Sequence, residues 1–199
     1  GALHRGASSS RNAGAWLATT THVAFLDDDD RWDPEFLAEC HTTLDITPAE
    51  LVTVGGIVEI GEERRPRPWL SKGQVKAADC IAWNPGITGS SFVVSLPALR
   101  DIAGFDEQLP VFNDLDFFVR FLKRGHSYAV VRRPLFTQTA DGAGHLSSRS
   151  ERRARGIELY MEKHRAELRW HQRRRLVREI HLARRHDRQT VALRVYYFA

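Results

Sequence analysis

Four consecutive aspartates, Asp27 to Asp30, directly follow the apolar run at residues 22–26. This run is partly β-branched, which is typical of a short buried strand. Behind the cluster, Asp33 and Pro34 predict the start of a helix, with Asp as the N-cap and Pro at the first helical position. We therefore expect the cluster in a strand-to-helix turn at the carboxyl end of a strand, where ligands bind in open α/β sheets.

The residues of the acidic cluster allow two interpretations. Adjacent carboxylates repel one another, so the cluster costs stability unless a cation neutralises it. Hard oxygen ligands suit Mg²⁺ or Mn²⁺, which is usually shared with a phosphate. The alternative is a solvated acidic turn, since runs of charge are often no more than that. The strand in front favours a metal site, because it directs the cluster to a ligand position.

Composition narrows the class of protein. The 199 residues are 42% hydrophobic and 27% charged, which is ordinary for a soluble globular protein. The sequence has no apolar run of the roughly 20 residues that cross a bilayer, and it shows no signal peptide. Cys40 and Cys80 form neither a disulfide framework nor a metal-ligand spacing. We therefore expect a cytoplasmic location.

Charge divides the chain near residue 148. Residues 151–199 carry 14 Lys and Arg against 6 Asp and Glu, whereas the remainder has 15 against 19. We predict a domain at residues 1–148 and a basic α-helical region at residues 149–199. The basic face is interpreted either as solvated or as a contact with an anionic membrane surface. Nucleic acid is disfavoured, because no reading motif accompanies the arginines.

Periodicity and turn signals predict the other elements of an α/β fold. We expect helices at residues 8–18 and 34–44, a strand with a glycine kink at 51–60, and a surface loop at 61–73. Next we expect a short strand or turn at 78–83, a strand ending at Ser95 and a helix capped by Ser95. The last expected elements are a helix that opens at residues 112–116 and is closed by Gly125, a strand at 127–131 and a loop at 134–148.

Four segments, in this order, resemble the motifs of family 2 glycosyltransferases with a GT-A fold. Ser10–Gly14 is similar to Ala-Arg-Asn-x-Gly, and Phe25–Pro34 to Phe-Leu-Asp-x-Asp-Asp-x-Trp-x-Pro. The third segment is Gly89–Phe92 followed by Gly104–Glu107. Asn113–Arg120 is similar to Glu-Asp-x-Asp-Leu-x-x-Arg. The resemblance covers roughly residues 8–148 and implies a GT-A-like, Rossmann-related mixed sheet flanked by helices, with a C-terminal helical appendage.

The resemblance implies a hexosyltransferase-type reaction, in which a sugar moves with inversion from a nucleotide diphosphate donor to an acceptor hydroxyl. The Asp-x-Asp motif corresponds to Asp27 and Asp29, which implies that both bind Mg²⁺ or Mn²⁺, with Asp29 as the principal ligand. Asp27 and Asp28 are expected near the donor ribose and sugar. Asp30 is a plausible partner that the sequence does not separate from them. The implied setting is cell-envelope or polysaccharide synthesis, with a glycan, lipid-linked or small-molecule acceptor.

Asp114 corresponds to the general base of the family, which takes the proton of the attacking hydroxyl. In this chain Asn113 replaces the Glu that precedes the base, so one negative charge is lost. The residues alone favour an N-cap for Asp114 and a first-turn charge for Asp116, whereas the resemblance favours the base. Arg120 is expected to anchor its helix by pairing with a carboxylate.

Two further residues are candidates for contacts with the donor. Arg11 is interpreted as a diphosphate contact or as a surface residue, since Arg suits bidentate binding of oxyanions. His145 corresponds to a loop residue that closes over the diphosphate or metal in some members, and is otherwise a solvated histidine.

The main departure from the family lies at the front of the chain. The opening strand and the following Asp that reads the nucleotide base are absent from this sequence. We therefore expect a chain that begins within a domain, with its first βαβ unit and its base pocket missing. Two other hypotheses remain open: a metal-dependent phosphohydrolase that uses the acidic cluster, and a non-catalytic binding module.

Overall fold

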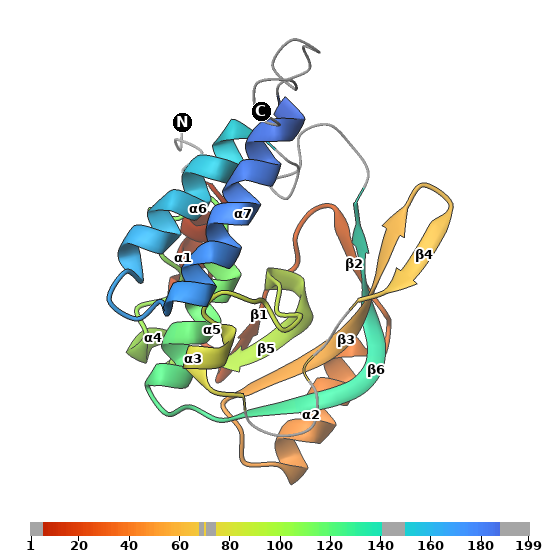
Figure 1. The fold of residues 1–199 in the computed structure, drawn as a ribbon. Coiled ribbons are helices and arrows are strands. Elements are labelled where there is room, and N and C mark those ends of the chain that lie inside the picture. The colour runs from red at the N-terminus through yellow and green to blue at the C-terminus, as the bar shows by residue number, and fades with distance from the viewer. Residues whose placement is uncertain (1–5, 68–69, 71–74, 141–149, 188–199) are drawn as a thin grey trace, which may run out of the picture.

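The computed structural model describes residues 6–67, 70, 75–140 and 150–187 (Figure 1). Its described residues form a six-stranded mixed sheet in the order β1-β5-β3-β6-β2, with β4 paired to β3. Among the strands that the structure describes, β3 and β6 are the only parallel pair, and the other pairs are antiparallel. The strands are β1 His22–Ala24, β2 Asp30–Trp32, β3 Leu51–Ile60, β4 Glu63–Pro66, β5 Phe92–Ser95 and β6 Tyr128–Thr139.

Helices cover both faces of this sheet. In Figure 1, α2 lies on one face, and the other helices gather on the opposite side. The helices are α1 Ala7–Leu17, α2 Phe36–Ile46, α3 Ala77–Cys80, α4 Leu96–Asp101, α5 Asn113–Lys123, α6 Glu151–Lys163 and α7 Trp170–Asp187, with a 3₁₀ turn at Gly89–Ser91.

The side chains of β3 show why both faces are covered. Leu51 belongs to the hydrophobic cluster under the larger helical layer, whereas Val52 and Val54 belong to the cluster beneath α2. Successive side chains of a strand point to opposite faces, so an apolar run such as this one is stable only between two layers. The core therefore has two parts, one on each side of the sheet.

Several predicted elements are confirmed. Helix α1 corresponds to the helix predicted at 8–18 and begins and ends one residue earlier. The glycine kink in β3 is a pair of register shifts around Gly55. Ser95 caps α4 by accepting a hydrogen bond from the amide of Ala98, and Gly125 follows α5 with a φ of 82°. The described residues of the basic C-terminal region form two helices, Glu151–Lys163 and Trp170–Asp187, as their pattern predicted.

Other predictions were wrong at the level of single elements. The predicted surface loop at 61–73 contains β4, because Gly61 adopts a φ of 59° and allows a tight hairpin after β3. The acidic turn leads into the short strand β2 before the helix, and α2 begins at Phe36. Strand β1 is shorter than predicted and only half-buried, because β5 is its sole neighbour among the described strands. The last strand continues to Thr139.

Helices α6 and α7 pack on the same core as the rest of the fold. Ile157 and Tyr160 of α6 and Leu176 of α7 are buried in the cluster that also contains Phe117 and Phe118 of α5. Across the described part of the chain, no helix has the length and apolarity needed to cross a membrane.

Candidate functional site

A cleft of about 1360 Å³ opens beside the end of β1. Its walls come from α1, the acidic turn, the start of α5 and the first turn of α6. The charged side chains that line it are Arg11, Asp27, Asp28, Asp29, Arg67, Asp114 and Arg153. The cleft thus brings together five of the residues that the sequence singled out, and adds two arginines that it did not.

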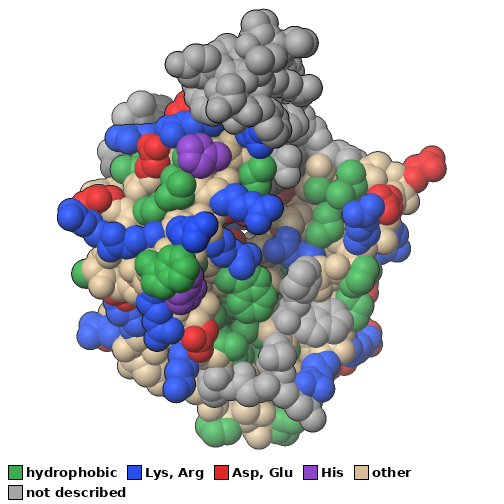
Figure 2. Space-filling view, viewed as in Figure 1, with side chains coloured by type: hydrophobic (Ala, Val, Ile, Leu, Met, Phe, Trp, Pro, Cys, Tyr) green, Lys and Arg blue, Asp and Glu red, His purple; other side chains and the backbone are tan. Residues whose placement is uncertain are grey.

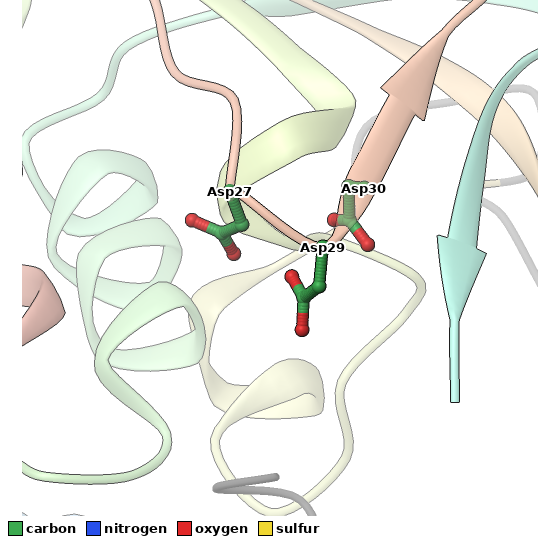
Figure 3. Close-up of side chains that lie close together, drawn as sticks. All are labelled: Asp27, Asp29 and Asp30. Carbon is green, nitrogen blue, oxygen red and sulfur yellow. The ribbon is translucent and has the colours of Figure 1, made fainter. Parts of the chain in front are cut away.

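Three of the four consecutive aspartates converge at the edge of the cleft. Asp27 lies in the loop after β1, Asp29 in the following turn, and Asp30 at the start of β2 (Figure 3). One carboxylate oxygen from each lies within 4.8 Å of the others, and this group could hold a metal ion. Asp28 also lines the cleft, but its side chain is exposed and lies outside the triad.

Asp30 is the buried member of this triad. It is 7% exposed, and neither carboxylate oxygen has a hydrogen-bond partner of ordinary geometry in the described structure. Burial raises the pKa of Asp30 to about 6, and the nearby Ser90 hydroxyl lowers it only in part. A buried carboxylate beside two others fits the oxygen donor set that Mg²⁺ or Mn²⁺ prefers.

Arg11 holds the acidic turn against two helices. Its Nη2 lies 2.5 Å from Asp27 Oδ1, and its Nη1 donates to Asn113 Oδ1 over 3.5 Å. The guanidinium also stacks 5.1 Å from the ring centroid of Phe105. Gly89 lies close beside it: a Cβ at that position would overlap Nη2 of Arg11, so a larger residue would displace the guanidinium. One oxygen of Asp27 is therefore already paired with Arg11.

Asn12 is a residue whose role the sequence did not reveal. Its Nδ2 donates to the carbonyl of Phe105, and its Oδ1 accepts from the amide of Phe105, both over 2.8 Å. This pair of hydrogen bonds ties α1 to the turn before α5. The available signal was its position beside Arg11 in the first resembling motif.

Asp114 lies in the first turn of α5 and faces the cleft. It is not the N-cap, which is Phe112. Burial raises the pKa of Asp114, whereas the charges of Arg11 and Arg67 act in the opposite direction. A carboxylate with a raised pKa at a cleft is a good proton acceptor near neutral pH.

Asp116, two residues further along α5, has a structural role. Its side chain is fully buried, with Arg120 Nε at 2.7 Å and His164 Nε2 at 2.9 Å. Burial alone would raise the pKa of Asp116, but the hydrogen bond with His164 and the charge of Arg120 lower it to about 2. Arg120 therefore pairs with a carboxylate, as expected, and its Nη2 also donates to the carbonyl of Gly104 over 2.7 Å.

Arg67 is the second residue that the sequence missed. It follows β4, lines the cleft, and bonds through Nη1 to Gln138 Oε1. Burial lowers its pKa, whereas the carboxylates of Asp114 and Asp30 raise it. Its position depends on the β3–β4 hairpin, which composition did not predict. His145 lies outside the described residues.

Together, the curled mixed sheet, its flanking helices and the acidic turn beside a cleft define a GT-A-like fold. Solved structures of S. aureus TarS share it. Residues 1–349 of TarS in complex with UDP-GlcNAc match with a TM-score of 0.62 and 19% identity, over 88% of this chain and 52% of that one. Another structure of TarS 1-349 matches with a TM-score of 0.59 and 18% identity, over 86% of this chain and 49% of that one. This chain therefore spans about half the length of those structures.

Residues 3–99 match the model of the glycosyl transferase family 2. This match covers just under half of the chain, and over that stretch it confirms the resemblance to the family. The GT-A-like fold is confirmed as well. No curated protein sequence matches the chain significantly.

Proposed function

We propose that the chain transfers a sugar, with inversion, from a nucleoside diphosphate donor to an acceptor hydroxyl. The observation that carries this proposal is the common cleft that Asp27, Asp29 and Asp114 line, with the carboxylate of Asp30 close to the first two. The match of residues 3–99 to the glycosyl transferase family 2 model supports the reaction class. The titles of two TarS structures, which name complexes with UDP-GlcNAc and with UDP, support a nucleotide-sugar donor.

Asp29 and Asp27 are the proposed ligands of a Mg²⁺ or Mn²⁺ ion, and the buried carboxylate of Asp30 joins them. A divalent cation at this position supplies neutralisation of the charge on the leaving diphosphate. Arg11 keeps Asp27 in place through its ion pair and lies close enough to the cleft to contact the diphosphate. Asp28 is proposed to face the donor sugar or ribose, and His145 to close over the diphosphate.

Asp114 is the proposed general base. Its carboxylate accepts the proton of the acceptor hydroxyl while the hydroxyl oxygen forms its bond to the anomeric carbon. The bond from that carbon to the diphosphate breaks on the opposite side, and a single in-line displacement of this kind inverts the configuration. The raised pKa of Asp114 strengthens it as a proton acceptor, and Arg11 and Arg67 help to keep it ionised.

We further propose a cytoplasmic setting in polysaccharide or cell-envelope synthesis, with peripheral contact to an anionic membrane. Figure 2 shows Lys and Arg side chains gathered over the face that α6 and α7 form. On α7 the exposed side chains include Trp170, which is 68% exposed, and three nearby arginines, Arg174, Arg175 and Arg178. A basic helix with an exposed tryptophan suits the headgroup region of an anionic bilayer.

Replacement of the base tests the proposed chemistry. In Asp114→Asn we expect kcat for sugar release from UDP-GlcNAc to fall by roughly 1000-fold, with the donor KM little changed. Steady-state kinetics with Mn²⁺ measure both constants, and Asp45→Asn, on the exposed end of α2, is the control. Phosphate release in place of sugar release would support the phosphohydrolase hypothesis, and full activity in Asp114→Asn would contradict the proposal.

A further inference from the structure

Helix α6 lies along the segment that carries Asp114. The residues that make the contact are Arg153, Gly156, Tyr160, Lys163 and His164. Arg153, Gly156, Tyr160 and Lys163 recur at intervals of three or four residues, so they occupy one face of the helix over three turns, and His164 is its C-cap. That face meets the chain from Pro110 to Asp116, which ends the loop before α5 and begins the helix.

The centre of this contact is Phe112, the N-cap of α5. Its φ of 60° and ψ of 17° lie in the left-handed region, which a bulky side chain rarely adopts. Such a conformation persists only where the surroundings impose it, and it occurs preferentially at functional sites. Phe112 also lines the cleft and stands two residues before Asp114.

Two side chains of α6 enclose the Phe112 ring. The guanidinium carbon of Arg153 lies 5.3 Å from the ring centroid, in cation–π geometry. The ring of Tyr160 meets Phe112 edge-on, with centroids 5.4 Å apart and an angle of 82° between the planes. Tyr160 is itself fixed, because it is fully buried and its hydroxyl donates to the carbonyl of Ile81 over 2.8 Å.

The contact is also fixed on either side of Phe112. Before it, Val111 packs against Gly156, where a Cβ would lie 2.5 Å from Val111 Cγ2. After it, Asp116 Oδ1 lies 2.9 Å from His164 Nε2 and 2.7 Å from Lys163 Nζ. Successive turns of α6 therefore hold the backbone immediately before and after Asp114, while Asp114 itself stays at the cleft.

We infer that α6 is a positioning element for Asp114, and that Arg153 and Tyr160 are its positioning residues. They hold Phe112 in the left-handed conformation from which α5 begins with Asp114 at the cleft. This inference rests on the proposed function, since it takes Asp114 to be the base. It assigns a part in the reaction to a helix beyond residues 3–99, the stretch that the family model matches.

The test compares Arg153→Ala with Arg155→Ala, a neighbour on the exposed side of the same helix whose side chain is 70% exposed. In Arg153→Ala we expect amide hydrogen exchange of residues 112–118 to quicken about tenfold or more, with an unchanged Tm. We expect kcat with UDP-GlcNAc and Mn²⁺ to fall by about 10- to 100-fold while the donor KM stays within about twofold. Arg155→Ala should match the wild type in every measurement.

A second variant asks whether Arg153 acts through the ring. Phe112→Gly adopts the left-handed conformation without strain but offers no ring to hold. We expect faster exchange and lower kcat in Phe112→Gly, and no additional loss when Arg153→Ala is added to it. Arg153→Lys, which keeps a cation over the ring, should restore part of the activity in the wild-type background.

Three results would overturn the inference. One is unchanged exchange and kcat in Arg153→Ala, and another is additive losses in the double variant. The third is a raised donor KM with unchanged kcat, which would make Arg153 a ligand of the donor. If the wild type neither binds UDP nor releases sugar, the proposed function fails, whereas the exchange measurement still decides whether α6 fixes this segment.

Discussion

Asp30 is the most costly residue of the acidic cluster. Its carboxylate is buried beside Asp27 and Asp29 and has no hydrogen-bond partner of ordinary geometry among the described residues. The pKa of Asp30 is 3.8 in the unfolded state and about 6 in the folded state. At a pH between these two values, the folded state binds more protons than the unfolded state. The free energy of unfolding therefore falls as the pH rises through this window.

Asp30→Asn should therefore stabilise the metal-free protein above about pH 6, because it removes a buried charge. The pKa shift of Asp30 corresponds to a gain of up to about 3 kcal/mol in the free energy of unfolding. Urea unfolding with a chelator, at about pH 7.5 and about pH 4, measures it, and the gain should vanish at the lower pH. Added Mn²⁺ should stabilise the wild type and not the variant. A variant that is less stable than the wild type at neutral pH without metal would contradict this account of Asp30.

At the scale of single residues, the sequence predicted what is local and missed what is distant. The acidic cluster is contiguous, so its carboxylates are near one another in any fold, and the convergence of Asp27 and Asp29 needed no tertiary information. Arg67 reaches Asp114 and Asp30 only because β4 folds back on β3. The double hydrogen bond of Asn12 with Phe105 joins positions 93 residues apart. No local pattern carries such contacts.

Among the elements, α5 and α6 are joined by the buried charges around Asp116. His164, at the C-terminal end of α6, and Arg120, on α5, both bond its carboxylate. Its folded pKa of about 2 lies below the unfolded value of 3.8. The contribution to stability is therefore fully present above about pH 4 and is lost as the pH falls toward 2.

Asp116→Asn should destabilise the protein at neutral pH by about 3 kcal/mol, because Arg120, Lys163 and His164 lose the buried carboxylate that they contact. The difference from the wild type should shrink as the pH falls from about 4 toward about 2, as the wild-type carboxyl becomes protonated. Urea unfolding across this range measures it. Asp101→Asn, which breaks exposed pairs with Arg124 and His126, should cost less than about 1 kcal/mol at any pH. Equal losses in the two variants would contradict the role of burial.

Elements with a strong period were predictable, and short ones were not. The helices α1 and α5 carry a continuous apolar face or clear end signals, such as Gly125. Strand β4 is a run of charged residues whose strand conformation comes from pairing with β3, where Arg64 meets Glu59 at 3.1 Å. Strand β2 is three residues long and forms only beside β6. In both strands the tertiary partner overrides local preference.

For the whole molecule, the charge asymmetry becomes a basic surface on one side (Figure 2). The exposed side of α7 presents Arg174, Arg175 and Arg178 near Trp170. Replacing the three arginines with Gln should weaken binding to vesicles that contain anionic lipid by roughly 100-fold, at about 1 kcal/mol for each charge. Sedimentation with such vesicles, and with purely zwitterionic ones, measures the effect.

A triple variant with the same loss of charge elsewhere controls for net charge. Arg31, Arg64 and Arg65 lie on β2 and β4 and are exposed. Their replacement with Gln should leave vesicle binding nearly unchanged, because charges away from the contact act only through the screened net field. Equal effects of the two triple variants would contradict a membrane contact through α7.

The central claim about the whole molecule is metal-dependent binding of a nucleoside diphosphate at the acidic triad. Isothermal titration calorimetry of UDP, with and without Mn²⁺, tests it most directly in the wild type, Asp29→Asn and Asp45→Asn. We predict binding in the wild type and Asp45→Asn only when Mn²⁺ is present, and a loss of at least about 100-fold in Asp29→Asn. Binding of UDP that is equal with and without Mn²⁺, or unaffected by Asp29→Asn, would contradict the account.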